Sequence, residues 1–228
     1  MRAISVILSL GIVLLLMPCL CISYAISEFG KKSLDEEGVL ILFDFNEDAQ
    51  VSDWIEVSDT KRSVGKSKAN IDIVESDAVR RAVFFTLLNP QEDGACFAGV
   101  RKVFEAAQDW SQYVYIAINR ARSQGENSEY KITVQDDKSV TNSSIVFEGY
   151  FDATSFVQDK DGFVFISYPL DDLICSYHGQ HCDDESADVN KNHILSLGLQ
   201  ISGGVYTDKY AQHGVASLGN FPLFFFFF

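Results

Sequence analysis

Basic residues are scarce in this sequence of 228 residues. Only 18 Lys and Arg stand against 32 Asp and Glu, which gives a formal net charge of -14, and no cluster of Lys or Arg interrupts the acidic background. Long-range repulsion from phosphate groups therefore excludes nucleic acid from the expected partners. The acidic residues gather in short loops, which is typical of a solvated surface, with calcium binding as the alternative.

Long helical patterns are also missing. No apolar stripe of helical period runs for more than about three turns. A short helix is an alternative to a strand only at Val100 to Ser111. Apolar, β-branched and aromatic residues instead form nine short segments separated by turn signals: Val39–Phe45, Lys68–Val74, Arg81–Leu88, Ala95–Phe104, Tyr113–Arg122, Glu129–Gln135, Ile145–Phe151, Phe163–Leu170 and Ile194–Ser202. The pattern predicts an all-β protein, an antiparallel β-sandwich of the jelly-roll type.

Catalytic and nucleotide-binding patterns are absent as well. The four histidines come late in the chain, and none stands in a recognisable nucleophile motif. Gly65-Lys66-Ser67 matches the end of a phosphate-binding loop, but Thr60 occupies the position where that loop needs its first glycine. The residues after Ser67 alternate like a strand, whereas the loop requires a helix. The sequence therefore predicts a non-enzymatic protein without a cofactor.

The N-terminal 25 residues have the pattern of a signal peptide. Arg2 precedes an apolar run, Pro18 ends it, and Ser23 and Ala25 are small residues at the positions that signal peptidase inspects. We expect cleavage after Ala25, a polar linker over 26–38, and a protein that is secreted or lumenal. A retained membrane anchor is the alternative, and only an uncleaved leader would give contact with a membrane.

Few cysteines remain after removal of the leader. Cys175 and Cys182 are close enough in sequence for a disulfide in an oxidising compartment; two free thiols, or a metal site with His178 and His181, are the alternatives. Cys96 has apolar neighbours, which predicts a buried thiol in the core.

Several longer motifs are similar to those of a known family. "LFDF" with Trp54 close behind, "VSDTKRSVGKSKA", "NPQEDGACFAGVRKVF", "YKITVQ" and "LGLQISGGVY" occur in the order and spacing of the complex I intermediate-associated protein 30 family. The resemblance covers Leu40 to Leu218 and defines a domain over 39–218. It implies a galactose-binding-like jelly roll, related in shape to carbohydrate-binding modules, and a non-enzymatic role like that of a mitochondrial member that holds assembly intermediates of respiratory complex I.

The family motifs also single out candidate site residues. In this sequence they are Trp54, Ser58, Asp59, Gly65, Ser67, Gly94, Phe97, Gly99, Arg101, Gly203 and Gly204. We expect Ser58 and Asp59 to bond backbone amides in a turn, and Gly65 to take a positive φ there, with a ligand rim as the alternative role. We expect the two tryptophans, Trp54 and Trp110, to pack in the core. The alternative is that they line a ligand rim together with Gly203 and Gly204.

Two features depart from the family. The leader is secretory in type, which leaves mitochondrial localisation as an alternative supported by the resemblance alone. Residues 219–228 end in a run of phenylalanines unrelated to the family's final strand. We interpret this tail as read-through of a pyrimidine-rich segment without a folding rationale, and expect one sheet edge to be left unpaired.

Two functional classes therefore follow from the sequence. The first is a chaperone-like module that binds a protein client through one face of the sandwich. The second is an extracellular or lumenal carbohydrate-binding module, whose partner is a glycan.

Secretion makes a prediction about the processed protein. Asn142 begins a glycan acceptor triplet with Ser143 and Ser144. In a eukaryotic secretory cell we expect mature protein that starts at Ile26 by N-terminal sequencing and loses mass on endoglycosidase treatment, a loss that Asn142→Gln abolishes. An intact leader, or accumulation of the tagged protein in mitochondria, would contradict the proposed route.

Overall fold

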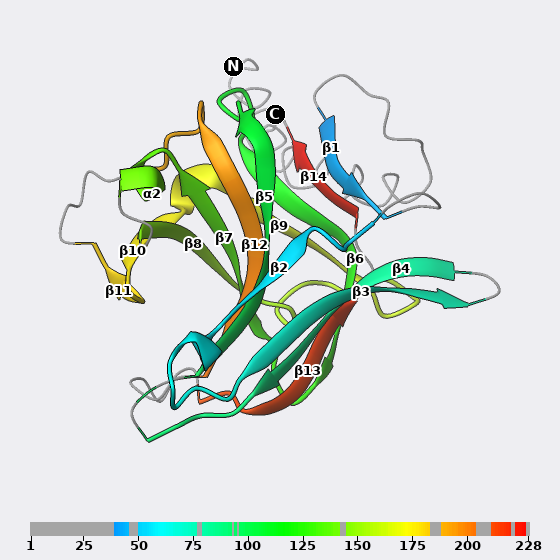
Figure 1. The fold of residues 1–228 in the computed structure, drawn as a ribbon. Coiled ribbons are helices and arrows are strands. Elements are labelled where there is room, and N and C mark those ends of the chain that lie inside the picture. Colours follow the sequence, from blue (N-terminus) through cyan, green and yellow to red (C-terminus); the bar gives the residue numbers. More distant parts are fainter. Residues whose placement is uncertain are drawn as a thin grey trace, which may run out of the picture. The chain divides into compact units, whose positions relative to one another are not determined.

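Two seven-stranded sheets make up the fold (Figure 1). The computed structural model describes residues 39–45, 50–76, 79–92, 94, 96–141, 145–182, 188–203, 211–219 and 222–226. The chain from Leu40 to Phe228 forms one compact unit. The predicted signal peptide with its cleavage site at Ala25, the linker 26–38, Asn142 and Gly204 all lie outside the described residues. Among these described residues, no helix has the length and apolar character needed to cross a membrane.

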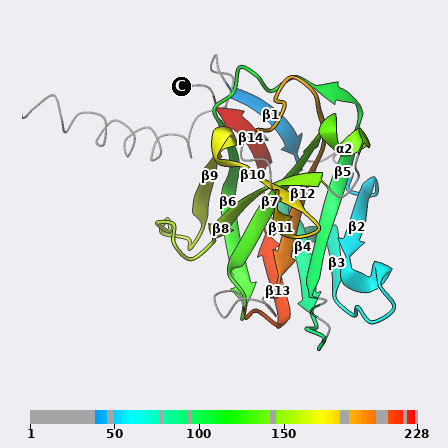
Figure 2. The ribbon, with the colours of Figure 1, turned by 90° about the vertical axis from the view of Figure 1, so that its left-hand side faces the viewer.

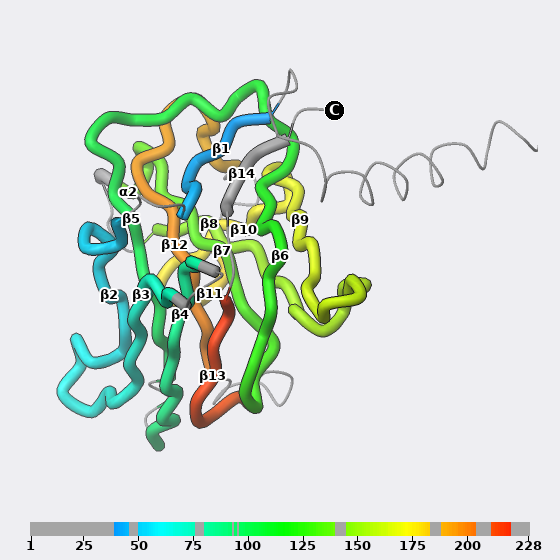
Figure 3. Tube along the Cα trace, turned by 90° about the vertical axis from the view of Figure 1, so that its right-hand side faces the viewer, coloured from blue at the N-terminus to red at the C-terminus, as the bar shows by residue number. Residues whose placement is uncertain are grey.

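The first sheet runs in the order β1, β14, β6, β13, β4, β3, and β9 pairs with β6. Its strands are β1 (Val39–Asp44), β3 (Lys68–Ser76), β4 (Val79–Leu88), β6 (Tyr115–Gly125), β9 (Val164–Pro169), β13 (Gly214–Gly219) and β14 (Pro222–Phe226). In Figure 3, β13 lies between β6 and β4, so this late strand fills a position in the middle of the sheet.

The second sheet runs in the order β11, β10, β8, β7, β12, β5, β2. Its strands are β2 (Trp54–Ser58), β5 (Phe97–Gln108), β7 (Glu129–Asp136), β8 (Ile145–Asp152), β10 (Ile174–Tyr177), β11 (Gln180–His181) and β12 (Ile194–Ser202). Figure 2 shows β8, β7 and β12 side by side. The remaining elements are short: α2 (Lys138–Thr141), and two 3-10 turns at Asp59–Lys61 and Leu170–Asp172.

The core lies between the two sheets. On β7, Tyr130, Ile132 and Val134 alternate toward the first sheet and are almost completely buried. The ring of Tyr130 meets that of Phe84 on β4 with centroids 6.4 Å apart. The predicted antiparallel β-sandwich is therefore confirmed, and each of the nine predicted segments overlaps a strand.

Some strands were not predicted from the sequence. β2, β10, β11 and β13 are short, and β13 begins and ends with glycine, so their composition alone gives little strand signal. The segment in which a helix competed, Val100 to Ser111, is instead mostly strand β5, paired with β12 and β2. Pairing with neighbours already in the sheet outweighs local helix propensity there.

The Phe-rich tail also differs from expectation. The main chain of Pro222–Phe226 forms β14 and pairs with β6, with Leu223 opposite Ile118 and Phe226 opposite Tyr115. On its other side β14 is hydrogen-bonded to β1, beside which it lies in Figures 1 and 2. The prediction of an unpaired edge is wrong for these residues, because an extended chain satisfies its amides on any available neighbour.

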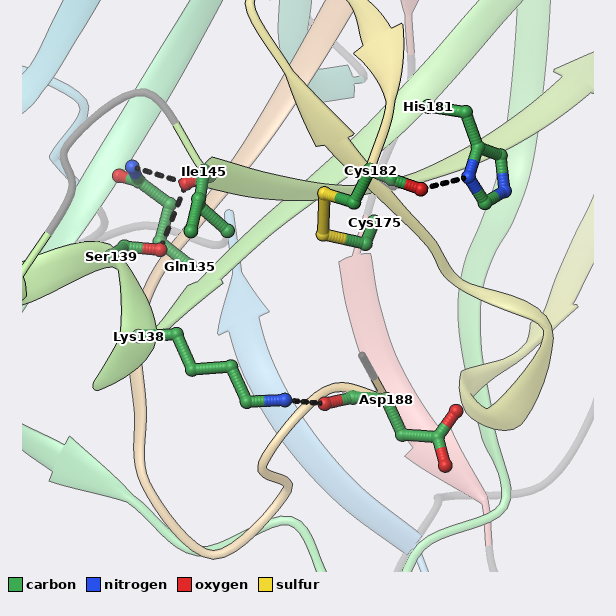
Figure 4. The surroundings of a disulfide bond; sticks show 8 residues. All are labelled: Gln135, Lys138, Ser139, Ile145, Cys175, His181, Cys182 and Asp188. Carbon is green, nitrogen blue, oxygen red and sulfur yellow. Dashed lines mark hydrogen bonds between the residues drawn. A yellow bond between two sulfur atoms is a disulfide. The ribbon is translucent and has the colours of Figure 1, made fainter. Parts of the chain in front are cut away.

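The three cysteines of the described chain occupy two environments. Cys175 and Cys182 are joined by a disulfide that closes the β10–β11 hairpin (Figure 4), and the Cys182 amide donates to the Cys175 carbonyl at 3.1 Å. The disulfide alternative is thus the state found. Cys96 is a buried free thiol, and burial raises its pKa. Among the described residues, no group of His, Cys, Asp or Glu is arranged to hold a metal ion.

The disulfide makes a prediction about stability. Because it closes a loop of only a few residues, its loss is expected to lower the free energy of unfolding by about 2 kcal/mol. Chemical denaturation of the double variant Cys175→Ser/Cys182→Ser, beside the oxidised and the reduced parent protein, measures this loss in the free energy of unfolding. Equal midpoints for the variant and the oxidised parent would show that the hairpin does not need the bond.

Candidate functional site

The second sheet has a polar outward face. The alternation that directs Tyr130, Ile132 and Val134 to the core directs the residues between them away from the first sheet. Register partners on neighbouring strands project to the same side of the sheet. Lys131 is the register partner of Gln200 on β12 and of Tyr150 on β8, so all three side chains lie on the outward side. We call the polar part of this surface the polar face; its members are Arg101, Lys131, Thr133, Gln135, Glu148, Tyr150, Ser196 and Gln200. The same side of the sheet also carries the exposed apolar side chains of Ile55, Val103 and Ile174.

A buried ion pair lies at the centre of the polar face. Lys131 is 6% exposed and Glu148 is 4% exposed, although both side chains project away from the core. The Lys131 Nζ lies 2.6 Å from Glu148 Oε1, and the Tyr150 hydroxyl donates to Glu148 Oε2 at 2.6 Å. Each partner compensates the lost hydration of the other, so removing one would leave a buried, unpaired charge.

The ion pair also fixes an aromatic side chain. Tyr150 is 40% exposed, and the Lys131 Nζ lies 5.5 Å from the centroid of its ring. Because the hydroxyl is held by Glu148 and the ring faces the ammonium group of Lys131, the exposed part of the ring has a defined orientation.

A second network lies nearby on the polar face. Arg101 Nη1 and the Ser196 hydroxyl both donate to Gln135 Oε1, the latter at 3.0 Å. The Gln135 amide nitrogen donates to the Ile145 carbonyl at 3.4 Å, and Ser139 donates to the same carbonyl (Figure 4). These contacts determine which end of the Gln135 amide faces Arg101. Burial lowers the pKa of Arg101.

Gly198 is the neighbour of Arg101 on β12, the strand that lies between Arg101 and Gln135. Arg101 lies on β5 and Gln135 on β7, so the side chain must cross β12, a span of about 10 Å between strands. Gly198 is the register partner of Arg101 on β12, and an added Cβ there would lie 2.6 Å from the Thr133 hydroxyl oxygen. Gly99, on the same face of β5, is similarly crowded, 2.6 Å from the Leu199 carbonyl oxygen. Glycine is required at both positions because neighbouring main chain and side chains approach closely.

The predicted loop residues gather at one end of the sandwich. Asp59 is fully buried; its Oδ1 accepts the Ser67 amide at 2.9 Å, and its Oδ2 accepts the Phe97 amide at 3.3 Å. The Ser67 hydroxyl in turn accepts the Asn89 amide at 3.1 Å. We call this cluster of Asp59, Ser67, Asn89 and Phe97 the Asp59 cluster. It ties the segment before β3 to the end of β4 and the start of β5.

Two details of that turn correct the sequence prediction. Gly65 does not have a positive φ; an added Cβ would lie 2.0 Å from the Asp59 carbonyl oxygen, so close approach is what requires glycine. The Ser58 hydroxyl pairs with Thr60 Oγ1 at 2.7 Å, not with a backbone amide. The Ser67 amide, which a phosphate loop would need, is already bound to Asp59.

The remaining motif glycines lie near the same end. Gly94 has a φ of 89° and donates to the Gln91 carbonyl at 3.0 Å, which closes a turn before β5. The Gly203 amide donates to the Cys96 carbonyl at 2.9 Å, and an added Cβ at Gly203 would lie 2.3 Å from the Cys96 sulfur. Gly203 therefore serves close packing at the end of β12.

The two tryptophans pack against neighbouring aromatic rings. Trp110 is 1% exposed and its ring packs edge-on against Phe104, with centroids 6.0 Å apart. Trp54 packs against Phe43 in the same manner at 5.1 Å. Trp110 follows the C-terminal end of β5, whereas Gly203 bonds to Cys96 before the start of that strand. The core role expected from the sequence holds for Trp110, so the rim alternative does not include this residue.

Comparison with protein families assigns the chain. The model of the family described as "Complex I intermediate-associated protein 30 (CIA30)" matches residues 43–219. The chain belongs to the complex I intermediate-associated protein 30 family. Comparison of this family member with curated proteins gave no match.

Solved structures show the same fold. A family 11 carbohydrate-binding module from Clostridium thermocellum, in complex with a β-1,3-1,4-mixed-linked tetrasaccharide, matches with a TM-score of 0.58 at 14% identity, covering 85% of this chain and 98% of the other. The family 11 module of the cellulase Lic26A-Cel5E of that organism matches with a TM-score of 0.56 at 13% identity, covering 85% and 97%. At these identities the likeness establishes the fold alone.

Sequence reasoning identified only part of the polar face. It selected Gly99 and Arg101 through family motifs but missed Lys131, Glu148 and Tyr150. The available signal was the position of a charged residue on the polar side of two alternating strands, "EYKITVQ" and "IVFEGYF". Only the register between β7 and β8 shows that these charges meet.

The Asp59 cluster makes a prediction about stability. Asp59→Ala would leave two amides without their acceptor, and we expect a loss of about 3 kcal/mol in the free energy of unfolding. Asp72→Ala, at an exposed position on β3, serves as the matched control and should change it by about 0.5 kcal/mol or less. Equal midpoints for both variants in urea denaturation would refute a structural role for Asp59.

Proposed function

We propose that this family member is a non-catalytic binding domain and that the polar face is its ligand surface. The observation that carries the proposal is the Lys131–Glu148–Tyr150 cluster. Charged side chains on the solvent side of a sheet ordinarily extend into water, but these are buried and hold one another in place. Donors and acceptors fixed before a ligand arrives reduce the entropy lost on binding.

A glycan suits the chemistry of this surface. Sugar hydroxyls need both donors and acceptors, and the C–H face of a pyranose ring packs on an aromatic ring. The polar face supplies the amide group of the partly exposed Gln200 and the partly exposed ring of Tyr150. The fold shared with family 11 carbohydrate-binding modules agrees with this proposal.

A secretory location supports the same ligand class. The leader of 25 residues, the acceptor triplet at Asn142 and the Cys175–Cys182 disulfide are each typical of proteins that mature in an oxidising compartment. We therefore propose that the domain acts outside the cell or in the lumen of the secretory pathway.

The contacts of Glu148 support a binding role over a catalytic one. A general acid or base needs an oxygen that can reach a substrate proton. Here Oε1 is bound by Lys131 and Oε2 by Tyr150, and the side chain is 4% exposed.

A protein client is a second candidate, favoured by the other side of the sandwich. Phe85, Leu87 and Val215 project from the outward face of the first sheet and are 41%, 42% and 64% exposed. Leu87 and Val215 are register partners on β4 and β13. Adjacent exposed apolar side chains are a common feature of protein-binding surfaces, and the family is named for association with complex I intermediates.

The two candidates make opposite predictions for matched variants. If the polar face binds a glycan, Tyr150→Ala should weaken binding of ligands found on a glycan array by about tenfold, which corresponds to about 1.4 kcal/mol. Tyr150→Phe should lose less, because the ring remains.

The control for this test lies on the opposite side of the sandwich. Leu87→Glu should leave glycan affinity unchanged in titration calorimetry. If no glycan binds, and Leu87→Glu instead abolishes co-purification of a protein client that Tyr150→Ala retains, the protein-binding candidate replaces the first.

A further inference from the structure

Arg101 is a cation without a counter-charge on the polar face. Lys131, the other cation of this face, is neutralised by Glu148. The ion pairs found in the described part of the chain do not include Arg101. Its hydrogen bond goes to the neutral amide oxygen of Gln135, and its Nε is buried without a hydrogen-bond partner.

This lack of a counter-charge is unexpected in so acidic a protein. With 32 Asp and Glu against 18 Lys and Arg, carboxylates are abundant, yet among the described residues none pairs with Arg101. Partial burial removes hydration from the guanidinium, and one neutral hydrogen bond compensates only part of that cost. The unmet interaction energy is therefore available to an anion brought by a ligand.

The surroundings of Arg101 permit such an approach. Arg101 is partly exposed, and its register partner on β12 is Gly198, which has no side chain. Gln135 holds Nη1 from one side, which fixes the plane of the guanidinium. Thr133 and Gln200 lie on the same face, are partly exposed and provide neutral polar groups.

We propose that Arg101 binds a carboxylate of the ligand, so that the glycan recognised by the polar face is an acidic one containing uronic acid residues. This inference rests on the proposed function. A planar guanidinium fork matches a carboxylate in shape and charge. The net charge of -14 opposes approach of a densely charged polyanion, so the ligand carries single, spaced carboxylates among neutral hydroxyl groups.

The architecture favours a sugar over an acidic peptide. Peptides that join a sheet do so at an edge, where main-chain groups are unpaired. The polar face belongs to β5, β12, β7 and β8, each of which has a strand paired on both sides. Recognition there must rely on side chains, which suits a ligand whose hydroxyls and carboxylates are all peripheral.

The experiment compares a charged ligand with its neutral counterpart. Tetrasaccharides of galacturonate and of glucuronate are titrated calorimetrically into the mature protein beside their methyl esters, which have the same rings but no charge. We expect the free acid of at least one to bind about tenfold tighter than its ester, a preference that weakens with salt. This comparison needs no variant and so does not depend on the folding of one.

Variants then assign the preference to Arg101. Arg101→Gln should bring the ratio of acid to ester affinity to about one, whatever its effect on affinity for the ester itself, with an unchanged thermal midpoint as the folding control. Arg101→Lys retains the charge without the fork and should keep only part of the preference.

Each other outcome overturns a specific claim. Equal affinity for acid and ester overturns the carboxylate inference and leaves glycan binding intact. Binding of neutral glycans alone also overturns the carboxylate inference and leaves glycan binding intact. Failure to bind any sugar overturns the proposed function as well. Binding of an oligoglutamate peptide that Arg101→Gln abolishes, without sugar binding, retains the carboxylate contact and refutes the glycan class.

Discussion

The packing of β7 against the first sheet is the constraint on which the rest of the structure depends. Tyr130, Ile132 and Val134 are removed from water by contact with residues such as Phe84, and a shift of one residue would exchange the two faces of the strand. The register of β8 and β12 against β7 follows from the same burial. Lys131, Thr133 and Gln135 are thereby forced onto one outward surface, where the polar face forms as a consequence of core packing.

Close main-chain approach is the second physical theme. Gly65, Gly99, Gly198 and Gly203 all occupy positions where a Cβ would meet another atom at 2.6 Å or less. Two of them shape the end of the sandwich around Asp59 and Cys96, and two lie on the polar face. A buried carboxylate that accepts two amides holds three strand ends together.

The local sequence pattern predicted the strands that are long and strongly alternating, because a strand with one buried face has an apolar residue at every second position. It failed for β10, β11 and β13, whose pairing is decided by neighbours, and for Pro222–Phe226, whose main chain completes the first sheet. The family motifs identified Asp59 and Arg101 as notable without distinguishing them. In the folded chain Asp59 is fully enclosed, whereas Arg101 is partly exposed and has no counter-charge among the described residues.

The sequence by itself determined the fold class and the family, because alternation and long motifs are properties of residues close together in the chain. It also identified the cysteine pair that closes the β10–β11 hairpin. Tertiary structure alone decided that Lys131 meets Glu148 and that Arg101 reaches Gln135, since these contacts join different strands. Charge pairing across a sheet depends on register, and register is fixed only when both sheets bury their apolar faces together.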